Sequence, residues 1–513
     1  MKVNEINLGT LFSRTAKTYG GKTAIIFNDK RISFDELNRR INSLSNALTG
    51  LGIRKNDKVA TLFFNTPEFL ETYFAIVKIG GVVVPLNFRL VAEELSYMLN
   101  DSKAKVLFYG KDFQGVINNI RSSNSISISH YICEESEAEN TLSYEELIGR
   151  NSDEEPNIDV SLEDPCAILY TAGTTGFPKG AVRTHYNICW DLLPHNSFLN
   201  FDHKSILLAT PPMFHIAGME VAALPGLMFG GTVIPVPAFN PEEMFQLIEK
   251  EKATHVFIVP AMAVAIKANV DVDSFDTSSL KEWMTASAPL PGEIRDWIFN
   301  KFPHVRLTNA YGMTETGTIS ALLPYDIGRK DATCVGKPNI TVGVRVVDTN
   351  DKDVSVGELG EIVVRAPMVI NEYYNLPKQT AESTTSGYFH TGDVGKFDEE
   401  GFLYIADRKK DMILTGGENV YAAEVENILF KHPKILEAAL IGIPDPKWGE
   451  VVTAVVVPKQ NEKIEPEEII GFCRKYLAGY KCPKKVYFLD ELPKNTFGKV
   501  LKRNLREKYG NSK

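Results

Sequence analysis

The segment of the sequence best suited to bind an anion is residues 170–180, Tyr-Thr-Ala-Gly-Thr-Thr-Gly-Phe-Pro-Lys-Gly. It follows an apolar run at residues 167–170 that predicts a buried strand. Glycines allow backbone N–H groups to turn toward an anion, and the threonine hydroxyls and the lysine ammonium add further donors. The spacing differs from a Walker A loop, because no Gly-Lys-Ser/Thr follows the first glycine at the required distance. We predict a phosphate-binding loop; a solvated Gly/Thr turn is the alternative.

Five further segments contain residues suited to nucleotide chemistry. They are residues 211–215 (Pro-Pro-Met-Phe-His), 309–315 (Asn-Ala-Tyr-Gly-Met-Thr-Glu), 388–393 (Tyr-Phe-His-Thr-Gly-Asp), 407–411 with 415–419 (Asp-Arg-Lys-Lys-Asp and Thr-Gly-Gly-Glu-Asn) and 493–499 (Pro-Lys-Asn-Thr-Phe-Gly-Lys). Together with the loop they resemble, in content and order, the motifs of the adenylate-forming superfamily, which includes acyl-CoA synthetases, amino-acid adenylation domains and beetle luciferases. The resemblance covers nearly the whole chain and is greatest to the compact bacterial fatty-acid–CoA ligases.

The resemblance implies a ligase that uses ATP, Mg²⁺ and CoA. A carboxylate is a poor electrophile, so it is first joined to the α-phosphate of ATP while pyrophosphate leaves. CoA then displaces AMP from the acyl-adenylate and a thioester forms. Because two anions must be brought together first, the site needs cations and oriented dipoles where negative charge gathers.

Four residues are assigned to adenylation by the resemblance. Lys499 bridges the substrate carboxylate and the α-phosphate, and Thr314 contacts the α-phosphate. Glu315 and Thr174 hold Mg²⁺, which usually takes only one or two carboxylates besides phosphate and water. The alternative for Lys499 is a surface lysine in a basic segment, but the surrounding Pro-Lys-Asn-x-x-Gly-Lys pattern favours a catalytic role.

The resemblance also implies a nucleotide site. Tyr311 supplies a ring for adenine stacking and Asn309 an amide for its exocyclic amine; a structural tyrosine and a turn asparagine are the alternatives. Asp393 accepts hydrogen bonds from the ribose diol, and Arg408 reaches the nucleotide from near the hinge. The other predicted cofactor-binding residues are Thr171, Gly173, Thr174, Thr175, Gly176, Lys179, Ser287, Ala288, Ala310, Gly312, Met313, Gly416, Gly417 and Glu418.

The second half-reaction is assigned to the C-terminal part of the chain. Gly416 and Gly417 would allow the pantetheine arm of CoA to approach the backbone closely. The resemblance implies that a small domain swings about Lys410 after adenylation, so that Lys499 leaves the site and the two glycines enter it. One site would thus serve two reactions.

His215 stands where amino-acid adenylation domains usually have an aspartate that pairs with the substrate ammonium. Without that carboxylate, an ammonium in an apolar pocket would be uncompensated, so amino acids are disfavoured. His215 is either a gate over the acyl site or a satisfied polar residue at its edge. The predicted acyl pocket is apolar, has small side chains and shows no cation; it consists of His215, Ile216, Ala217, Gly218, Met219, Ser287, Ala288, Gly312 and Met313.

This pocket predicts a medium- or long-chain fatty acid as the substrate. An aryl acid of the hydroxycinnamate or benzoate type, or another short carboxylic acid, is the alternative. A luciferase-like oxidoreductase is the rival class, since luciferases share all of the motifs.

Strand and helix patterns alternate along the chain, which predicts parallel sheets covered by helices. Buried strands are expected at residues 24–27, 59–64, 82–85 and 106–109. Ser33 and Glu36 form a capping-box pattern that predicts the start of a helix.

The five charged residues 407–411 cannot sit in a core and predict an exposed connector. Together with this connector, the resemblance implies an α/β fold in which residues 1–406 form a large AMP-binding domain of α/β subdomains plus a β-rich subdomain. Residues 407–411 form a hinge, and residues 412–513 form a small mobile α+β domain.

Composition restricts the classes of partner and the cellular compartment that we expect. The net charge of −9 argues against nucleic acid. The six cysteines lack C-x-x-C pairs and the N-terminus lacks a signal-peptide core, so a cytoplasmic protein is expected.

Residues 221–239 are uncharged, but their prolines and glycines indicate buried core rather than a membrane span. Residues 481–513 hold ten Lys or Arg against three acidic residues, so peripheral contact with an anionic membrane stays open, as does a homodimer.

Overall fold

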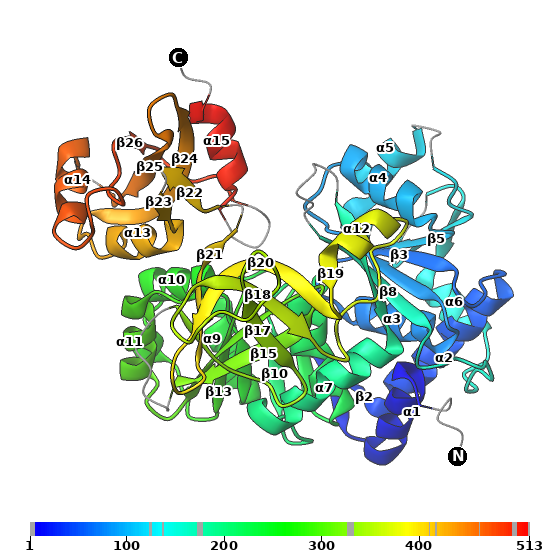
Figure 1. Ribbon diagram of the computed structural model, residues 1–513. Helices are drawn as coiled ribbons and strands as arrows, with labels where there is room; N and C mark the ends of the chain where they lie inside the picture. The colour runs from blue at the N-terminus through cyan, green and yellow to red at the C-terminus, as the bar shows by residue number, and fades with distance from the viewer. Residues whose placement is uncertain are drawn as a thin grey trace.

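The computed structural model describes residues 6–122, 126–135, 138–171, 178–325, 333–409, 411–415, 418–460, 462–494 and 500–510, without the side chains of residues 197 and 198. Figure 1 shows a large body built from the N-terminal and central parts of the chain, with a smaller C-terminal unit, orange to red, set to one side. Three β-sheets with helices between and around them make up the two parts. The predicted fold class, a large N-terminal α/β domain and a small C-terminal domain, is confirmed.

The first sheet has seven strands in the order β7-β6-β5-β3-β4-β8-β9. They are β3 (Lys58–Leu62), β4 (Val82–Pro85), β5 (Val106–Tyr109), β6 (His130–Cys133), β7 (Thr141–Ser143), β8 (Pro165–Thr171) and β9 (Lys179–Thr184). Neighbouring strands run parallel, except that β9 turns back antiparallel to β8. The strands predicted at 82–85 and 106–109 are confirmed, and β3 corresponds to the strand predicted at 59–64. The helices of this part are α3 (Pro67–Lys78), α4 (Ala92–Ser102), η2 (Lys111–Phe113), α5 (Gln114–Ser122) and α6 (Tyr144–Arg150).

Two N-terminal helices, α1 (Leu8–Tyr19) and α2 (Phe34–Gly50), pack near this sheet. The Ser33 hydroxyl accepts the backbone N–H of Glu36 at 3.2 Å, which confirms the predicted start of α2. Leu37, Ile41 and Leu44 recur at helical spacing and are fully buried. The amphipathic pattern therefore fixes which face of α2 meets the core.

The large sheet changes from parallel to antiparallel pairing along its length. Its order is β17-β18-β20-β21-β16-β15-β14-β13-β12-β10-β11-β1-β2, with β19 beside β20. Its strands are β1 (Thr23–Phe27), β2 (Lys30–Ser33), β10 (Ile206–Ala209), β11 (Thr232–Pro235), β12 (His255–Phe257), β13 (Glu282–Thr285), β14 (Arg306–Met313), β15 (Gly317–Pro324), β16 (Cys334–Pro338), β17 (Gly343–Val347), β18 (Gly360–Arg365), β19 (Thr384–Thr385), β20 (Tyr388–Phe397) and β21 (Leu403–Arg408). Strand β14 pairs parallel with β13 and antiparallel with β15, so the change occurs there.

The helices of the central region are α7 (His185–Leu199), η3 (Ala217–Ala223), α8 (Leu224–Met228), α9 (Pro241–Glu251), α10 (Pro260–Asn269), η4 (Val272–Ser274), α11 (Gly292–Lys301) and α12 (Pro377–Ser383). Helix η3 is a π-helix, a rare form that is often found at functional sites. The end of helix η3, helix α8 and strand β11 together occupy most of the uncharged stretch 221–239. Among the described residues, no helix is long and apolar enough to span a bilayer.

The C-terminal part has a sheet of its own in the order β23-β22-β25-β24, with β26 beside β25. The strands are β22 (Ile413–Thr415), β23 (Glu418–Val420), β24 (Ile435–Asp445), β25 (Gly449–Pro458) and β26 (Lys485–Phe488). The helices are α13 (Ala422–Leu429), α14 (Pro466–Arg474) and α15 (Lys502–Gly510). A separate apolar cluster that includes Ile413, Val425 and Leu440 fills this part, so it buries a core of its own.

The charged connector at residues 407–411 is less exposed than we expected. Strand β21 continues to Arg408, and Asp407 is only 8% exposed because its carboxylate accepts the backbone N–H groups of Ala422 and Ala423. Asp411 is also buried and pairs with Arg506 at 2.9 Å. The prediction of exposure was wrong for these two aspartates, since hydrogen bonds and an ion pair offset the cost of burying their charges.

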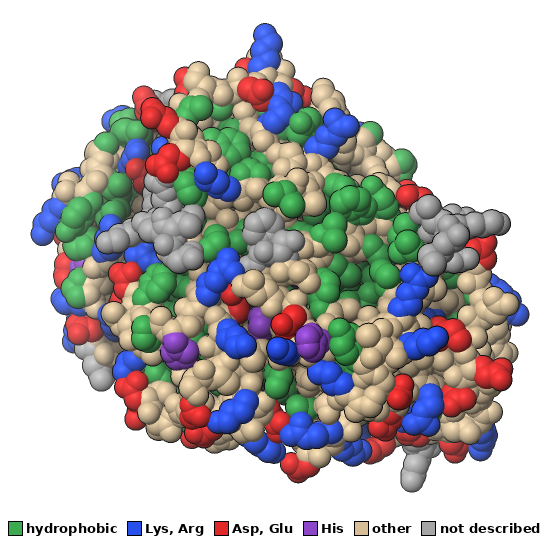
Figure 2. Space-filling model, turned by 90° about the horizontal axis from the view of Figure 1, so that it is seen from below, with side chains coloured by type: hydrophobic (Ala, Val, Ile, Leu, Met, Phe, Trp, Pro, Cys, Tyr) green, Lys and Arg blue, Asp and Glu red, His purple; other side chains and the backbone are tan. Residues whose placement is uncertain are grey.

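The molecular surface mixes charges of both signs. Figure 2 shows the face seen from below, where acidic and basic side chains are interspersed and hydrophobic side chains gather between them. On this face, therefore, neither sign of charge forms a continuous field.

A buried ion cluster joins β9, α7 and η3. The guanidinium of Arg183, fully buried, donates to Asp191 at 3.0 Å and to Glu220 at 2.7 Å. Two carboxylates thus share one cation away from water. Burial raises the pKa of Glu220 to about 7; Arg183 opposes this rise and Asp191 adds to it.

This pKa predicts a pH dependence of stability. Below pH 4.5, the ordinary pKa of glutamate, the carboxyl group is protonated in both the native and the unfolded state. As the pH rises from 4.5 to 7 only the unfolded chain releases the proton, so the native state loses on the order of 3 kcal/mol of stability. The Glu220→Gln variant lacks this loss. The unfolding temperature of the variant minus that of the wild type should therefore increase from pH 5 to pH 8.

Thermal unfolding of both proteins across this pH range checks the prediction. Glu467→Gln, on the exposed face of α14, serves as the control and should follow the wild-type curve at a constant offset. Parallel curves for wild type and Glu220→Gln would contradict the raised pKa.

Candidate active site

The turn between β14 and β15 carries two of the predicted site residues, Thr314 and Glu315. Both are buried, with 5% and 6% of their surface exposed. The hairpin closes tightly: a Cβ on Gly312 would lie 2.4 Å from the carbonyl oxygen of Thr318. Gly317 has φ +88°, a left-handed conformation that favours glycine. These two glycines therefore permit the sharp turn that presents Thr314 and Glu315 at the end of β14.

The Glu315 carboxylate faces the strand that leads into the predicted phosphate loop. Its Oε1 accepts the hydroxyl of Thr171, the last residue of β8, at 3.0 Å, and the hydroxyl of Tyr373 at 3.1 Å. Its backbone carbonyl accepts the N–H of Ile370 at 2.9 Å. Glu315 is thus tied to β8 on one side and to the segment after β18 on the other.

Lys179 lies on the same side of the site as Glu315. It begins β9, and its ammonium is 5.1 Å from the centroid of the Tyr373 ring. The backbone N–H of Tyr374 donates to Gly180 at 2.7 Å, which fixes the two segments together. A carboxylate, two hydroxyls and an ammonium therefore converge where the loop begins and ends.

A second group of side chains surrounds Asp393 on β20. Its carboxylate accepts the hydroxyl of Tyr311 at 2.7 Å and the Nε–H of Arg408 at 2.6 Å. Asp393 and Arg408 are direct partners across β20 and β21, so backbone register sets this pair. Burial raises the pKa of Tyr311 well above its ordinary value, and Asp393 raises it further, so the phenol keeps its proton and donates.

The predicted acyl segment is mostly packed. A Cβ on Gly218 would lie 2.2 Å from the carbonyl oxygen of Pro212, so only glycine fits there. Ile216 clusters with Ala167 and Leu169 of β8, and helix η3, which contains Met219, contacts β15. The segment therefore lies against the strand before the predicted phosphate loop and against the strand that follows Glu315.

His215 is neutral at pH 7. Burial lowers the pKa of its imidazole to about 4. Its Nδ1 accepts the backbone N–H of Ala217 at 3.2 Å, which leaves the ring proton on Nε2. Nearby in the predicted pocket, Ser287 adopts φ +76°, an unusual conformation for a residue with a side chain and one that is associated with functional sites.

Several predicted residues lie outside the described parts of the chain. They are Gly173, Thr174, Thr175, Gly176, Lys410, Gly416, Gly417 and Lys499. Of the others, Asn309 and Ala310 are buried within β14, Met313 ends that strand, and Ala288 follows Ser287. Glu418 lies apart on β23, where it lines a cavity of about 390 Å³ in the C-terminal part.

Tyr373 was missed by sequence reasoning. It contacts Glu315 from 58 positions away in the chain, and its local sequence gives no motif that would reveal this. Only the fold brings the two side chains together.

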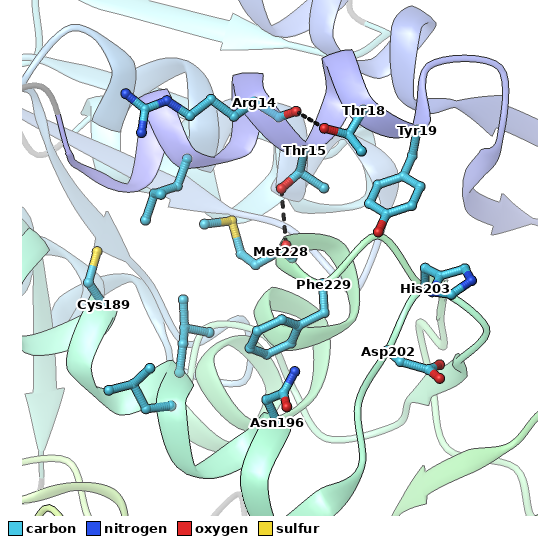
Figure 3. A pocket seen from close by; sticks show the side chains of 13 residues that line it. Arg14, Thr15, Thr18, Tyr19, Cys189, Asn196, Asp202, His203, Met228 and Phe229 are labelled. Atoms are coloured by element: carbon cyan, nitrogen blue, oxygen red, sulfur yellow. Dashed lines mark hydrogen bonds between the residues drawn. The ribbon is translucent and has the colours of Figure 1, made fainter. Parts of the chain in front are cut away.

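A separate cavity of about 610 Å³ lies between α1, α7 and α8. In Figure 3 the ring of Tyr19 lies beside His203, on which it stacks with a centroid distance of 5.9 Å, and Thr15 donates to the carbonyl of Met228. None of the described residues that line this cavity is a predicted site residue. The site around Glu315 and Asp393 is therefore a different part of the molecule.

Comparison with known proteins defines the family. The family model for AMP-binding enzymes matches residues 12–374, and the model for the C-terminal domain of AMP-binding enzymes matches residues 424–499. The chain belongs to this family, which confirms the resemblance to adenylate-forming enzymes. It is an AMP-forming acyl-CoA ligase, an enzyme class that uses ATP, Mg²⁺ and CoA.

The similar proteins differ in the acids named for them. Feruloyl-CoA synthase of Amycolatopsis sp is 37% identical over 505 residues, which are 98% of this chain and 99% of that protein. A long-chain-fatty-acid–CoA ligase of Mycobacterium tuberculosis is 36% identical over 484 residues, 94% of each. The structure of ATP-bound MatB from Rhodopseudomonas palustris superimposes with a TM-score of 0.90 at 32% identity and 99% coverage of both chains.

The donor set around Glu315 fits Mg²⁺ bound to a nucleotide. One carboxylate with a neighbouring hydroxyl leaves most ligand positions to phosphate oxygens and water, which is the usual arrangement for this ion in nucleotide sites. Asp393, with its two carboxylate oxygens already aligned by Tyr311 and Arg408, suits a vicinal diol.

The proposed ribose contact yields a testable prediction. In Asp393→Asn the side chain keeps its shape but loses its charge, so its hydrogen bonds to the nucleotide and to Arg408 weaken. We expect the Kd for ATP to rise about tenfold, since a hydrogen bond to a charged group contributes ~1.5–3 kcal/mol. Calorimetric titration with ATP measures this change. Asp348→Asn, in an exposed turn after β17, is the control; an unchanged Kd in Asp393→Asn would contradict the assignment.

Proposed function

We propose that this enzyme joins a medium- or long-chain fatty acid to CoA in the cytoplasm. The observation that carries the proposal is that Glu315 and Asp393 lie around β14, while the neutral, apolar segment that begins at His215 packs against β8, whose Thr171 contacts Glu315, and against β15, which follows Glu315. All six cysteines are free, which fits a reducing compartment.

The first half-reaction forms the acyl-adenylate. A carboxylate oxygen of the acid attacks the α-phosphorus of ATP, a new P–O bond forms, and the bond to pyrophosphate breaks. Lys499 is proposed to bridge the two anions, and Thr314 to contact the α-phosphate. Mg²⁺ neutralises charge on the phosphates when bound, and Glu315 with Thr174 would hold it. Tyr311, Asn309, Asp393 and Arg408 would orient the nucleoside.

The second half-reaction forms the thioester. The sulfur of CoA attacks the acyl carbon, the thiol proton is released, and AMP leaves with the bond electrons. We propose that the C-terminal domain rotates about residues 407–411, with Lys410 as the pivot, and brings Gly416 and Gly417 toward the adenylate. In support, the chain passes from the large sheet at Arg408 to the small sheet at Ile413 within a few residues.

The chemistry of the acyl segment supports a hydrophobic monocarboxylic acid. His215 is neutral at pH 7, and its neighbours Ile216, Ala217 and Met219 are apolar. A second charged group on the substrate would have no partner in this described segment and would be costly to bury. A fatty acid meets this requirement, and the mycobacterial relative carries the name of a fatty-acid ligase.

An aryl acid is the second candidate, favoured by a specific contact. Phe88 and Phe214, the residue before His215, pack edge to face with ring centroids 5.2 Å apart. Aromatic edges and faces suit a planar ring in the substrate, and the relative of 37% identity is named a feruloyl-CoA synthase.

A panel of acids tests the two candidates. The enzyme is incubated with ATP, Mg²⁺, CoA and either a saturated fatty acid from C6 to C18 or one of ferulate, benzoate and indoleacetate. We expect AMP and thioester to form in equal amounts, with kcat/KM highest for a fatty acid of medium or long chain. A maximum at an aryl acid would overturn the fatty-acid proposal, and AMP release without any thioester would contradict ligase activity for this panel.

The role of Lys499 predicts a split between the half-reactions. Lys499→Ala should lower pyrophosphate exchange by at least a hundredfold, because the charge that bridges the two anions is lost. Thioesterification of a supplied acyl-adenylate should stay within about threefold of wild type, since Lys499 has left the site by then.

Lys508→Ala, on α15, is the matched control and should leave both rates unchanged. An equal fall of both rates in Lys499→Ala would show that its proposed role is wrong.

A further inference from the structure

The turn that carries Glu315 is clamped between two elements. On one side, the carboxylate of Asp191 on α7 accepts the backbone N–H of Thr318 at 2.9 Å and its hydroxyl at 2.9 Å. On the other side, the segment after β18 holds the Glu315 carbonyl through Ile370 and its carboxylate through Tyr373. Gly317 lies between the two sides: a Cβ there would be 2.4 Å from Met368 and 3.2 Å from Asp191.

Both sides of the clamp are hydrogen-bonded to members of one ion pair, Arg183 and Asp191. The Arg183 guanidinium donates one N–H to the carbonyl of Met368 and another to Asp191. Asn187, one helical turn before Asp191 on α7, donates to the carbonyls of Pro367 at 2.8 Å and Val369 at 3.0 Å. Strand β9 and helix α7 thus fix the spacing between Thr318 and the 367–369 segment.

We propose that Asp191, anchored by Arg183, is a positioning residue that sets the Glu315 carboxylate for Mg²⁺ bound to ATP. The inference rests on the proposed function, in which Glu315 holds that ion. Asp191 touches neither nucleotide nor metal; it acts by holding Thr318, three residues after Glu315. Magnesium demands nearly ideal octahedral geometry, so a small displacement of its one protein carboxylate weakens binding.

The burial of the cluster supports this role. Arg183 is fully buried, and Asp191 and Glu220 are 1% and 2% exposed. Ionisable groups in a water-free interior are weak evidence for stability, because apolar residues of the same size often serve as well. Their directional hydrogen bonds to one turn and one loop supply a fixed geometry, which apolar packing would not.

A hydroxyl deletion isolates the positioning effect. Thr318→Val removes the hydroxyl bond to Asp191 but keeps the backbone N–H, the side-chain volume and the ion pair. Thr318→Ser restores the hydroxyl and is the rescue variant. Tyr144→Phe is the matched control, because Tyr144 on α6 also donates a buried hydroxyl to an arginine-paired carboxylate, Glu71 on α3, at 2.8 Å.

Calorimetric titration with ATP, with Mg²⁺ and with EDTA in its place, gives the decisive readout. We expect Thr318→Val to weaken ATP binding at least fivefold with Mg²⁺ and less than twofold with EDTA. Thr318→Ser should return to within twofold of wild type, and Tyr144→Phe should lower the unfolding temperature without changing the Mg²⁺ dependence. Thioesterification of a supplied acyl-adenylate should stay within twofold throughout.

Three results would overturn the proposal: equal weakening with and without Mg²⁺, the same effect in Tyr144→Phe, or no change in Thr318→Val. Asp191→Asn, which keeps the side-chain shape, decides the question if Thr318→Val does not fold, and it should shift the Mg²⁺ dependence in the same direction. Wild-type protein that binds ATP with Mg²⁺ but forms no thioester with any acid contradicts the proposed function alone, and the calorimetric comparison still tests the role of Asp191.

Discussion

The close approach of the backbone at the β14–β15 hairpin is the constraint on which the rest of the site depends. Gly312 and Gly317 let the chain reverse where the large sheet changes from parallel to antiparallel pairing. In open α/β sheets, ligands bind beyond the carboxyl ends of strands where the topology changes. The hairpin projects Thr314 and Glu315 at this edge, and Tyr311, on the same strand, reaches across to Asp393 on β20.

Burial of carboxylates beside hydroxyl donors gives the site its electrostatic character. Glu315 and Asp393 are 6% and 4% exposed, and each accepts at least one tyrosine hydroxyl. The hydroxyls compensate the buried charge of Glu315 without neutralising it fully, whereas Asp393 is also paired with the Arg408 cation and the Arg183 cluster shares one cation between two carboxylates. A buried carboxylate held by hydrogen bonds can attract a cation or accept from a diol, which is why we propose that Glu315 and Asp393 serve different ends of one nucleotide.

Local patterns in the sequence predicted several individual elements, because strands and helices reflect the periodicity of apolar residues. Strands β4 and β5 appear at the predicted residues, and α2 begins at its predicted cap. The burial of charged side chains was predicted less well. Asp407 and Asp411 were expected in solvent, and Arg183 gave no signal at all, since Glu220, one of its partners, lies 37 positions away. Whether a charge can be buried depends on a partner that only the tertiary fold supplies.

The same contrast explains why the sequence suggests specific residues for the proposed ATP contacts but does not identify the acid. Phosphates and a ribose diol require directional, charged partners, so the chemistry restricts the residues to a few types at fixed spacing. A hydrophobic tail is held by burial, which has no direction and is roughly proportional to the area removed from water, at ~0.8 kcal/mol per CH₂. Ile216, Ala217 and Met219 meet that requirement equally for an alkyl chain or an aromatic ring. Relatives named for ferulate and for long-chain fatty acids accordingly stand at 37% and 36% identity to this chain, so overall similarity does not separate their substrates. We therefore propose that the shape of the acyl site at the His215 segment, rather than any single functional group, selects the acid.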